Sequence, residues 1–275
     1  MESKATDSDR DTMAPSSSWT SLYKQYFDTE KTLFHYFTEK SEFSFDSISQ
    51  PLDQVERVFA SDALKGDLLM YYGISITIHL LFPAVERFKR IIVVCLLDTD
   101  LQHIEKWMKK DPETFSWKPS LEFHYENEKE RERWAWKEEK SKELITEVVK
   151  AESTDSGMEA PGHLPQADCV LLPYILNFMC PDKNSFITSI RSVSMMLKVG
   201  GHMLIHLFMN ATFFLIGEFK FPLLCTDKEF VLKVICDSGL VIKESEMNKR
   251  VNDTKFSSID FDAIFFLCVC KERDV

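Results

Sequence analysis

The residues with the most chemical potential lie where a strand turns into a helix, in the stretch GDLLMYYGISITIHLL at 66–81. Its apolar start predicts a buried strand, and the residues from Ser75 onward are expected to be helical. Turns of this kind bind nucleotide cofactors when glycines let the backbone come close to the ligand. Here the turn holds a single glycine, Gly73, followed by the hydroxyl of Thr77. The stretch therefore has the outline of a cofactor loop with few of the groups that such a loop uses.

Other residue pairs offer less chemistry. His202 and His206 are four residues apart on a predicted strand and face the same way, but a metal site needs further ligands, which the sequence does not supply. Cys268 and Cys270 also share a strand face and are expected to be buried core thiols. No Ser/His/Asp or Cys/His arrangement indicates nucleophilic catalysis. We therefore expect neither a metal ion nor a protein nucleophile.

Composition limits the class of partner. The chain has 275 residues, a net charge of −11 and only eight glycines. An acidic balance argues against binding to nucleic acid or to an anionic membrane. The polar N-terminus has no apolar signal region, and no CxxC pair occurs. We expect a cytoplasmic monomer with no nucleic-acid or membrane partner; a protein partner is not predicted. Of Trp134 and Trp136 in a charged helix, one is expected to be buried and the helix face solvated.

The chain divides into a tail and one domain. Residues 1–18 are rich in Ser, Asp and Thr and are predicted to be disordered. Residues 19–275 are predicted to form a single domain, in which 19–60 form a helical lid and 61–275 form an α/β core. Aromatic residues at helical spacing over 19–37 are the basis for the first lid helix.

Strands and helices are expected to alternate through the core. The predicted strands are 66–72, 90–97, 121–126, 167–175, 202–208, 240–247 and 261–271. The predicted helices are 75–88, 98–110, 126–150, 182–198 with a glycine cap at 199–201, and 227–239. Asp98 or Asp100 is expected to cap the second of these helices. This order predicts an α/β fold with a mostly parallel sheet and a C-terminal antiparallel pair at one edge.

Seven segments together carry a resemblance to a known family. They are LKGDLL, TIHLL, AVERFKRIIV, EKWMKKDPETFSW, LPQADCVL, LKVGGHMLI and IGEFKF, in order from residue 64 to residue 221. The series resembles the nicotinamide, phenylethanolamine and indolethylamine N-methyltransferases, and the likeness extends from about Leu22 to Lys271. It implies a Rossmann-like class I methyltransferase fold. It also implies S-adenosylmethionine as the cofactor and a small amine or pyridine as the methyl acceptor.

The resemblance implies which residues would contact the cofactor. The family's first turn is of the type Asp-Ile-Gly-Ser-Gly-Pro-Thr, and this chain reads Tyr-Tyr-Gly-Ile-Ser-Ile-Thr over 71–77. Gly73 and Thr77 match this pattern. The family's ribose-binding acid falls on Cys95, and its adenine-contacting acid falls on Glu152. A Ser-containing pair in the fourth strand is replaced by leucine and proline at 172–173. The cofactor-binding residues that the resemblance leaves are therefore Gly73, Thr77 and Glu152.

Substitutions on the implied substrate side replace polar groups by apolar ones. We expect these apolar side chains to fill part of the former cavity: Tyr71, Ile74, Ile76, Leu207, Phe213 and Phe214. One interpretation is a weak or inactive methyltransferase, a pseudoenzyme that acts through protein contacts or binds a different apolar ligand. The alternative is an active N-methyltransferase of a small amine with a rebuilt pocket, which would use Glu152, Asp98 or Asp100, and Tyr72 in new roles. A nicotinamide-dependent oxidoreductase is disfavoured because the turn lacks GxGxxG spacing.

Overall fold

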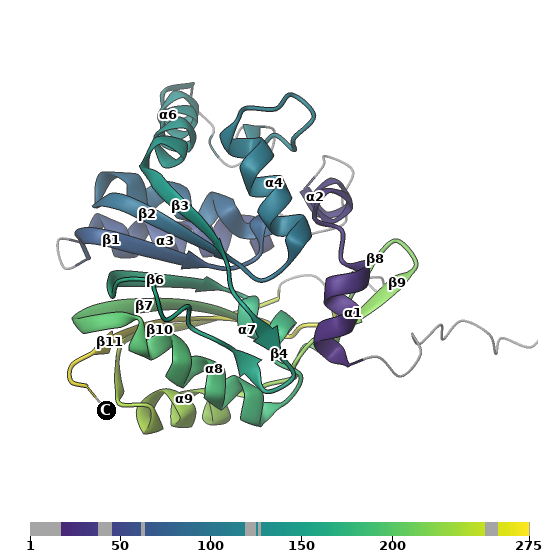
Figure 1. The fold of residues 1–275 in the computed structure, drawn as a ribbon, viewed down its shortest axis with the longest axis vertical. Coiled ribbons are helices and arrows are strands. Elements are labelled where there is room, and N and C mark those ends of the chain that lie inside the picture. Colours follow the sequence, from purple (N-terminus) through teal and green to yellow (C-terminus); the bar gives the residue numbers. More distant parts are fainter. Residues whose placement is uncertain are drawn as a thin grey trace, which may run out of the picture.

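A seven-stranded sheet forms the centre of the molecule (Figure 1). The computed structural model describes residues 18–37, 46–61, 64–118, 125, 128–250 and 258–274. Along the sheet the strands are β10 (Leu240–Lys249), β11 (Ala263–Lys271), β7 (Leu197–Met209), β6 (Ala167–Pro173), β1 (Gly66–Tyr72), β2 (Phe88–Cys95) and β3 (Ile145–Lys150). Two small hairpins stand apart from it, β4 (Ser153–Thr154) with β5 (Gly157–Met158) and β8 (Phe213–Ile216) with β9 (Phe219–Pro222).

The direction of the strands confirms the predicted α/β class. From β3 to β7 neighbouring strands run parallel, whereas β11 is antiparallel to β7 and β10 is antiparallel to β11. Parallel strands are usually buried on both faces. The runs in β1, β2 and β6 are accordingly almost continuously apolar and buried. The expected antiparallel pair therefore forms one edge of the sheet.

Helices pack on both faces of the sheet. On one face lie α3 (Asp46–Ala60), the 3₁₀ segment η1 (Ser75–Glu86), α4 (Asp98–Met108) and α6 (Glu128–Leu144), with α3 and α6 both against η1. On the other lie α8 (Lys183–Met195) and α9 (Lys228–Asp237), which contact each other. Of the two tryptophans in α6, Trp134 is buried and Trp136 is 49% exposed, as expected from the sequence. Of the helices that the structure describes, none is long and apolar enough to cross a membrane.

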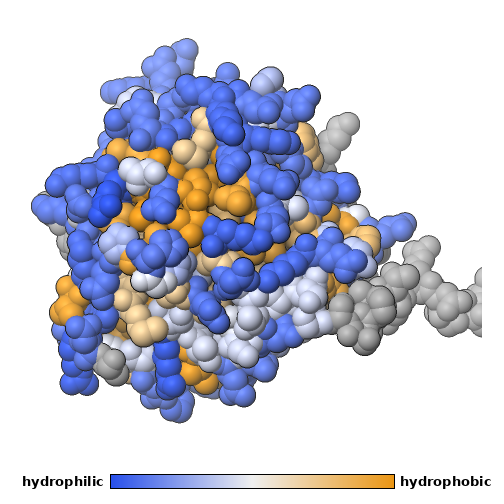
Figure 2. All heavy atoms as spheres, in the orientation of Figure 1, coloured by the Kyte–Doolittle hydropathy of each residue, from blue (hydrophilic) through white to orange (hydrophobic). Residues whose placement is uncertain are grey.

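The two halves of the sheet differ in how they are covered. Figure 1 shows α8 and α9 against the half that contains β7 and β10. On the face shown in Figure 2, apolar side chains gather over the half that contains β1, β2 and β3, and hydrophilic side chains surround them. Cover by helices on this face is therefore concentrated on the half formed by the later strands.

The N-terminal segment is two helices rather than one. Helix α1 (Trp19–Tyr26) ends at Phe27, whose backbone is extended, and α2 (Thr29–Phe37) follows. The Asp28 side chain accepts a hydrogen bond from the backbone N–H of Lys31 at 3.0 Å, which favours the start of a new helix at this point. The aromatic spacing predicted the helical content and missed this break. The predicted disordered tail lies outside the described residues, apart from Ser18.

One further element prediction was wrong, and another falls almost wholly outside the described residues. The helix predicted over 126–150 ends at Leu144, and its last six residues form β3 against β2. The β-branched residues of ITEVVK favour this pairing, and the charged run before them masked the change. The strand predicted over 121–126 lies outside the described residues except for Tyr125, which is not in a strand.

The glycine cap predicted at 199–201 was also wrong. Gly200 and Gly201 lie inside β7, and α8 ends earlier, at Met195. Gly200 has a φ of +84°, a conformation that favours glycine. A Cβ on Gly201 would lie 2.9 Å from the carbonyl oxygen of Lys198. The irregular start of β7 therefore requires glycine at both positions. Because glycine is also common at helix ends, the sequence alone did not distinguish the two.

One buried side chain ties the carboxyl end of β7 to the chain beyond it. Asn177, in helix α7 (Ile175–Met179), donates its amide to the carbonyl oxygens of Phe208 and Leu224, both at 3.0 Å. Its own side-chain oxygen accepts from the Phe208 N–H at 2.9 Å. These bonds replace backbone pairing where β7 leaves the sheet, which is where the ligand site of such a fold would lie.

We predict that Asn177→Leu lowers the free energy of unfolding by about 3 kcal/mol or more, since it leaves three buried backbone groups without partners. Urea denaturation measures the change. Asn184→Leu, at an exposed position of α8, is the matched control and should change stability by about 0.5 kcal/mol or less. Equal losses in the two variants would show that the Asn177 bonds do not hold this end of the strand.

Candidate functional site

The candidate site lies at the carboxyl ends of β1 and β6. The chain proceeds from β1 to β2 and β3 on one side, and then returns to β6 and β7 on the other. In open α/β sheets ligands bind in the crevice at such a reversal of strand order. Gly73 follows β1, and Tyr174 follows β6 in a left-handed conformation with a φ of 59°. A bulky residue in this conformation is uncommon, and such residues cluster at functional sites.

The turn after β1 is filled by a side chain of its own strand. Tyr71 is fully buried, and its hydroxyl donates to the carbonyl oxygen of Ile74 at 2.7 Å and lies 2.6 Å from the hydroxyl oxygen of Thr77. A Cβ built on Gly73 would lie 2.9 Å from the Tyr71 ring. The two matching residues, Gly73 and Thr77, are therefore brought together. Both contact a tyrosine ring, which is what requires the glycine here.

A buried carboxylate binds the other side of the same turn. One oxygen of Asp100 accepts hydrogen bonds from the Ser75 backbone N–H at 2.9 Å, the Ser75 hydroxyl at 2.6 Å and the Thr29 hydroxyl at 2.9 Å. Its other oxygen is buried and has no partner among the described residues. Burial raises the pKa of Asp100 to about 6, and these hydrogen bonds partly offset the rise.

The prediction that Asp98 or Asp100 caps α4 was wrong. The N-cap residue is Leu97, and no side chain caps this helix. Asp98 forms an ion pair with Lys150 at the surface. Asp100 instead turns inward, away from the exposed end of its helix, because the hydroxyls of Thr29 and Ser75 and a backbone N–H offer it three donors.

Little open space remains between the lid and the strand ends. The cavity there has a volume of about 40 Å³. Its walls are mostly aromatic and include Tyr36, Phe37, Tyr174, Phe178, Phe208 and Phe214, together with Thr77 and His79 from η1. Ligand sites are typically about 300–1,000 Å³. The cavity has room for about one to three water molecules. A second pocket, of about 570 Å³, lies on the other side of α2 and is lined by Asp28, Glu30, Phe34, His35 and Ile216 among others.

All but one of the side chains expected to fill part of the former cavity are buried, and the filling itself remains a prediction. Five side chains of the predicted set are buried: Tyr71, Ile74, Ile76, Leu207 and Phe214. Phe213 is the exception, since it is half-buried and the Lys220 ammonium lies 4.3 Å from the centre of its ring. Cys95, on which the ribose acid of the family falls, is fully buried, and burial raises the pKa of its thiol well above the usual value. It is therefore neutral and cannot substitute for a carboxylate.

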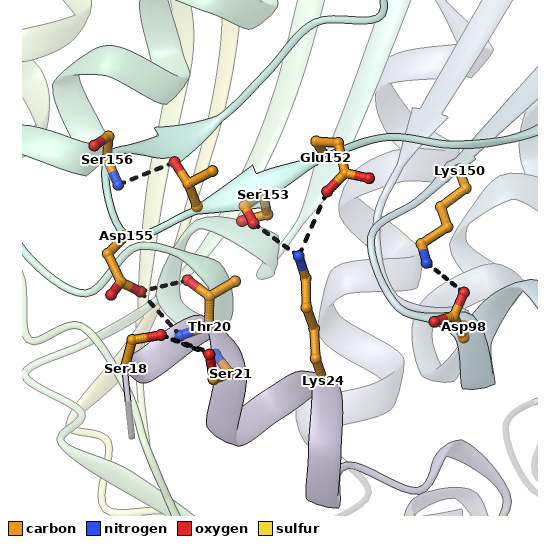
Figure 3. A network of polar contacts seen from close by, with 11 residues as sticks. Ser18, Thr20, Ser21, Lys24, Asp98, Lys150, Glu152, Ser153, Asp155 and Ser156 are labelled. Carbon is orange, nitrogen blue, oxygen red and sulfur yellow. Dashed lines mark hydrogen bonds and ion pairs between the residues drawn. The ribbon is translucent and has the colours of Figure 1, made fainter. Parts of the chain in front are cut away.

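The third candidate, Glu152, lies apart from the turn. It follows β3, its side chain is 68% exposed, and one of its carboxylate oxygens lies 3.5 Å from Lys24 Nζ (Figure 3). The structure thus places Glu152 in an ion pair with the N-terminal helix α1. Its role as an adenine contact remains a prediction.

The same network attaches α1 to the β4–β5 hairpin. Lys24 also donates to the Ser153 carbonyl oxygen at 3.1 Å, and the Thr20 hydroxyl donates to Asp155 at 2.6 Å (Figure 3). The indole N–H of Trp19 donates to the Phe178 carbonyl oxygen at 2.8 Å, and the Tyr23 hydroxyl donates to the Pro222 carbonyl oxygen. Helix α1 therefore contacts both the hairpin and the aromatic wall of the cavity.

Neither strand histidine is placed as a metal ligand. His206 is fully buried, its two ring nitrogens have no partner among the described residues, and burial lowers its pKa to about 3. Its ring lies between Tyr174 and Phe266, at centroid distances of 5.7 and 4.9 Å. Within the described part of the chain no group of three or more His, Cys, Asp or Glu side chains could hold a metal ion.

Sequence reasoning missed the residues that close the turn from outside it. Thr29, Asp100 and Ser75 come from three separate elements, and no spacing in the chain connects them. Tyr174 was included only as the end of a predicted strand. The one signal in the sequence was Asp100 at the expected start of α4, where a carboxylate is usually expected to cap the helix.

Comparisons with known proteins agree with this fold. The sequence profile of the NNMT/PNMT/TEMT family matches residues 18–272. The chain is 34% identical to human nicotinamide N-methyltransferase over 227 residues, which is 82% of this chain and 86% of that enzyme. It is 31% identical to mouse indolethylamine N-methyltransferase over 188 residues, covering 68% and 71% of the two chains. Magnesium protoporphyrin IX methyltransferase from Synechocystis, solved with bound SAH, has a TM-score of 0.57 at 12% identity and covers 92% of this chain and 100% of that one. This last likeness concerns the fold alone.

We predict that Gly73→Ala lowers the free energy of unfolding by about 1–3 kcal/mol, because the new methyl group overlaps a buried, hydrogen-bonded ring. In a Tyr71→Ala background the same change should cost much less, and the double-mutant cycle should give a coupling of about 1 kcal/mol or more. Thermal and urea denaturation measure both. Gly162→Ala, where a Cβ would meet nothing within 4 Å, is the control and should be close to neutral. Additive costs for Gly73 and Tyr71 would contradict the assigned packing.

We predict that Asp100 makes stability fall as the pH rises. Its pKa is raised from 3.8 to about 6 on folding, so above pH 4 the folded protein retains a proton that the unfolded chain has lost. The resulting stabilisation is complete below pH 4 and is lost as the pH passes 6. The free energy of unfolding of the wild type, measured relative to Asp100→Asn, should therefore drop by up to about 3 kcal/mol between pH 4 and pH 7. Asp98→Asn is the exposed control. Parallel curves for the wild type and Asp100→Asn would refute the prediction.

Proposed function

Because the chain belongs to the NNMT/PNMT/TEMT family, we propose that it is a member in which the protein's own side chains occupy the place of the cofactor, so that methyl transfer is weak or absent. The family fold places the ligand crevice at the carboxyl ends of β1 and β6. The cofactor that this proposal concerns is S-adenosylmethionine. The acceptor class, should transfer occur, is a small amine or pyridine, in line with the names of the relatives.

The observation that carries the proposal is the position of Tyr71. Its ring lies against Gly73, and its hydroxyl donates to the Ile74 carbonyl oxygen. The same hydroxyl lies 2.6 Å from the hydroxyl oxygen of Thr77. A cofactor loop must leave its backbone free for close approach by the ligand. Here that approach would have to displace a fully buried aromatic side chain, and truncating such a side chain costs about 3–5 kcal/mol.

Two further features support the same proposal. Asp100 accepts the Ser75 N–H, a backbone donor of the turn that would otherwise face a ligand. The 40 Å³ cavity is roughly a tenth of the size that small-molecule sites need. Methyl transfer depends on holding the acceptor in line with the methyl–sulfur bond rather than on a protein nucleophile. We therefore assign no catalytic residue.

One observation favours the alternative of an active enzyme with a rebuilt pocket. The hydroxyl of Tyr174 is buried, lines the cavity and has no hydrogen-bond partner among the described residues. An unpaired buried hydroxyl is costly, and a ligand acceptor atom would satisfy it. In this alternative the lid would have to open and the cavity would have to enlarge. Glu152, Asp98 or Asp100, and Tyr72 would then take new roles.

The surroundings that we propose follow the same reasoning. The compartment is the cytosol, since the seven cysteines are free thiols and five of them are buried. We propose a monomer that uses no metal ion and binds neither nucleic acid nor membrane.

The hydroxyl of Tyr72 donates to the Glu159 carbonyl oxygen at 2.6 Å, which supports a structural role for that residue.

The test measures transfer of an isotope-labelled methyl group from S-adenosylmethionine to a panel of amines and pyridines. Human nicotinamide N-methyltransferase serves as the positive control. We expect transfer at least about a hundredfold slower than the control, since the loss of the ribose acid alone is worth roughly ten- to a hundredfold. Saturable transfer to any acceptor at a rate near that of the control would overturn the proposal and support the alternative.

Thermal denaturation with 1 mM S-adenosylhomocysteine measures binding apart from turnover. A dissociation constant near 10 µM would stabilise the folded chain by about 2.7 kcal/mol. We expect no such shift in this protein and a clear shift in the human enzyme. A stabilised but inactive chain would mean that the cofactor place is open and only the acceptor place is lost.

A further inference from the structure

Asp100 connects three elements that are distant in sequence. It lies in the first turn of α4, while its hydrogen-bond donors are Thr29 at the start of α2 and Ser75 at the start of η1. Helix α2 is part of the lid, and η1 begins the turn after β1. A single carboxylate oxygen, Asp100 Oδ1, therefore joins helix α2 to the turn after β1.

The geometry points to an exchange of a ligand for a side chain. The Ser75 N–H and hydroxyl both point at the same oxygen, 2.9 and 2.6 Å away. Paired donors of this kind at the start of a helical segment favour an anionic group. Here the anion is supplied by the chain itself, and Asp100 is fully buried.

We propose that Asp100 is an internal ligand of the turn, which occupies the donors of Ser75 and, through Thr29, locks the lid helix α2 closed over it. This inference rests on the proposed function, in which the turn holds no cofactor. It goes further by naming the contact that keeps the closed arrangement. It also means that an anionic ligand meets a competing carboxylate at the turn before it meets any donor.

The surroundings of Asp100 fit a lock rather than a general salt bridge. Among the described residues no Lys, Arg or His pairs with it. The titratable groups that face it are Tyr71 from β1 and Cys95 from β2, and burial keeps both of them neutral by raising the pKa of each. The hydroxyls of Thr29 and Ser75 and one N–H therefore provide all of its hydrogen bonds. Loss of any of them acts directly on the lid or on the turn.

Helix α2 is held at several points, and the Thr29–Asp100 bond is the one that joins it to the turn after β1. The Tyr36 hydroxyl also donates to the carbonyl oxygens of Leu215 and Ser258, and Glu30 lies 3.1 Å from His103 of α4. Phe34 is 53% exposed, and His35 and Lys31 face the outer side of the helix. The inner side is held by Leu33, Tyr36 and Phe37, which pack on the cavity wall and the β8 hairpin. The Thr29 hydroxyl anchors the first turn of the helix.

Hydrogen exchange of the full chain, followed by mass spectrometry, tests the lock. In Asp100→Ala we expect the amides of residues 29–37 and 73–80 to exchange about ten to a hundred times faster, as the loss of a hydrogen bond to an ionised group implies. The amides of β10 and β11 should keep their rates, which separates local opening from general destabilisation. Asp98→Ala, which removes only a surface ion pair, should change neither region.

Two milder variants keep the test valid if Asp100→Ala does not fold. Thr29→Val keeps the shape and removes one donor, so it should speed exchange in 29–37 and leave 73–80 unchanged. Ser75→Ala should do the reverse. Unchanged exchange in both segments, or an equal increase that includes β10 and β11, would overturn the lock.

The outcome is separable from that of the proposed function. Faster exchange in Asp100→Ala with no binding of S-adenosylhomocysteine to either protein supports the lock and leaves the proposed function standing, because Tyr71 still fills the turn. Binding by the wild type together with a lid that opens in the variant supports the lock and refutes the proposed function. Binding by the wild type with an unchanged lid refutes both.

Discussion

The backbone polar groups of the turn after β1 must find partners, and the rest of the site follows from how this chain supplies them. A buried N–H or C=O without a partner is costly, so the donors and acceptors of such a turn are bound by a ligand, by water or by the protein. Here the Ile74 carbonyl accepts from Tyr71, and the Ser75 N–H donates to Asp100. With these groups satisfied internally, the turn can be buried, and apolar and aromatic side chains close over it.

The N-terminal helices α1 and α2 are also held by hydrogen bonds to polar groups of the same chain. Helix α1 is attached by short contacts between its own side chains and carbonyl oxygens or carboxylates, those of Trp19, Thr20 and Lys24 among them. Helix α2 is attached at its start through Thr29. Between these points the packing is aromatic: Tyr23, Phe178 and Phe214 lie with ring centres 5.0–6.1 Å apart. Directional bonds at the ends and ring packing in the middle give a single closed arrangement.

The fold could be predicted from the sequence where burial alone decides. Continuous apolar runs such as that of β2 indicate strands that are covered on both faces, and the order of elements indicates a mostly parallel sheet. Prediction failed where one residue type serves two purposes. Glycines at 200 and 201 serve a strand as well as they would a helix end, and a charged run hid the start of β3. Burial of the apolar residues around the turn could be predicted, because side-chain type is visible in a sequence. The bond between Asp100 and Thr29 could not, since contacts between distant segments leave no local pattern.

Retention of Gly73 has a consequence for how such a chain can change over time. The glycine accommodates the ring of Tyr71, so the packing requires it whether or not a cofactor binds. Replacing Tyr71 alone by a small residue would leave a void in a tightly packed region. The free energy of unfolding would fall by about 3–5 kcal/mol. Replacing Asp100 alone by an apolar residue would leave the hydroxyls of Thr29 and Ser75 without their acceptor. Each single replacement therefore gives a less stable molecule, so Tyr71, Gly73 and Asp100 constrain one another and can be exchanged without loss only in combination.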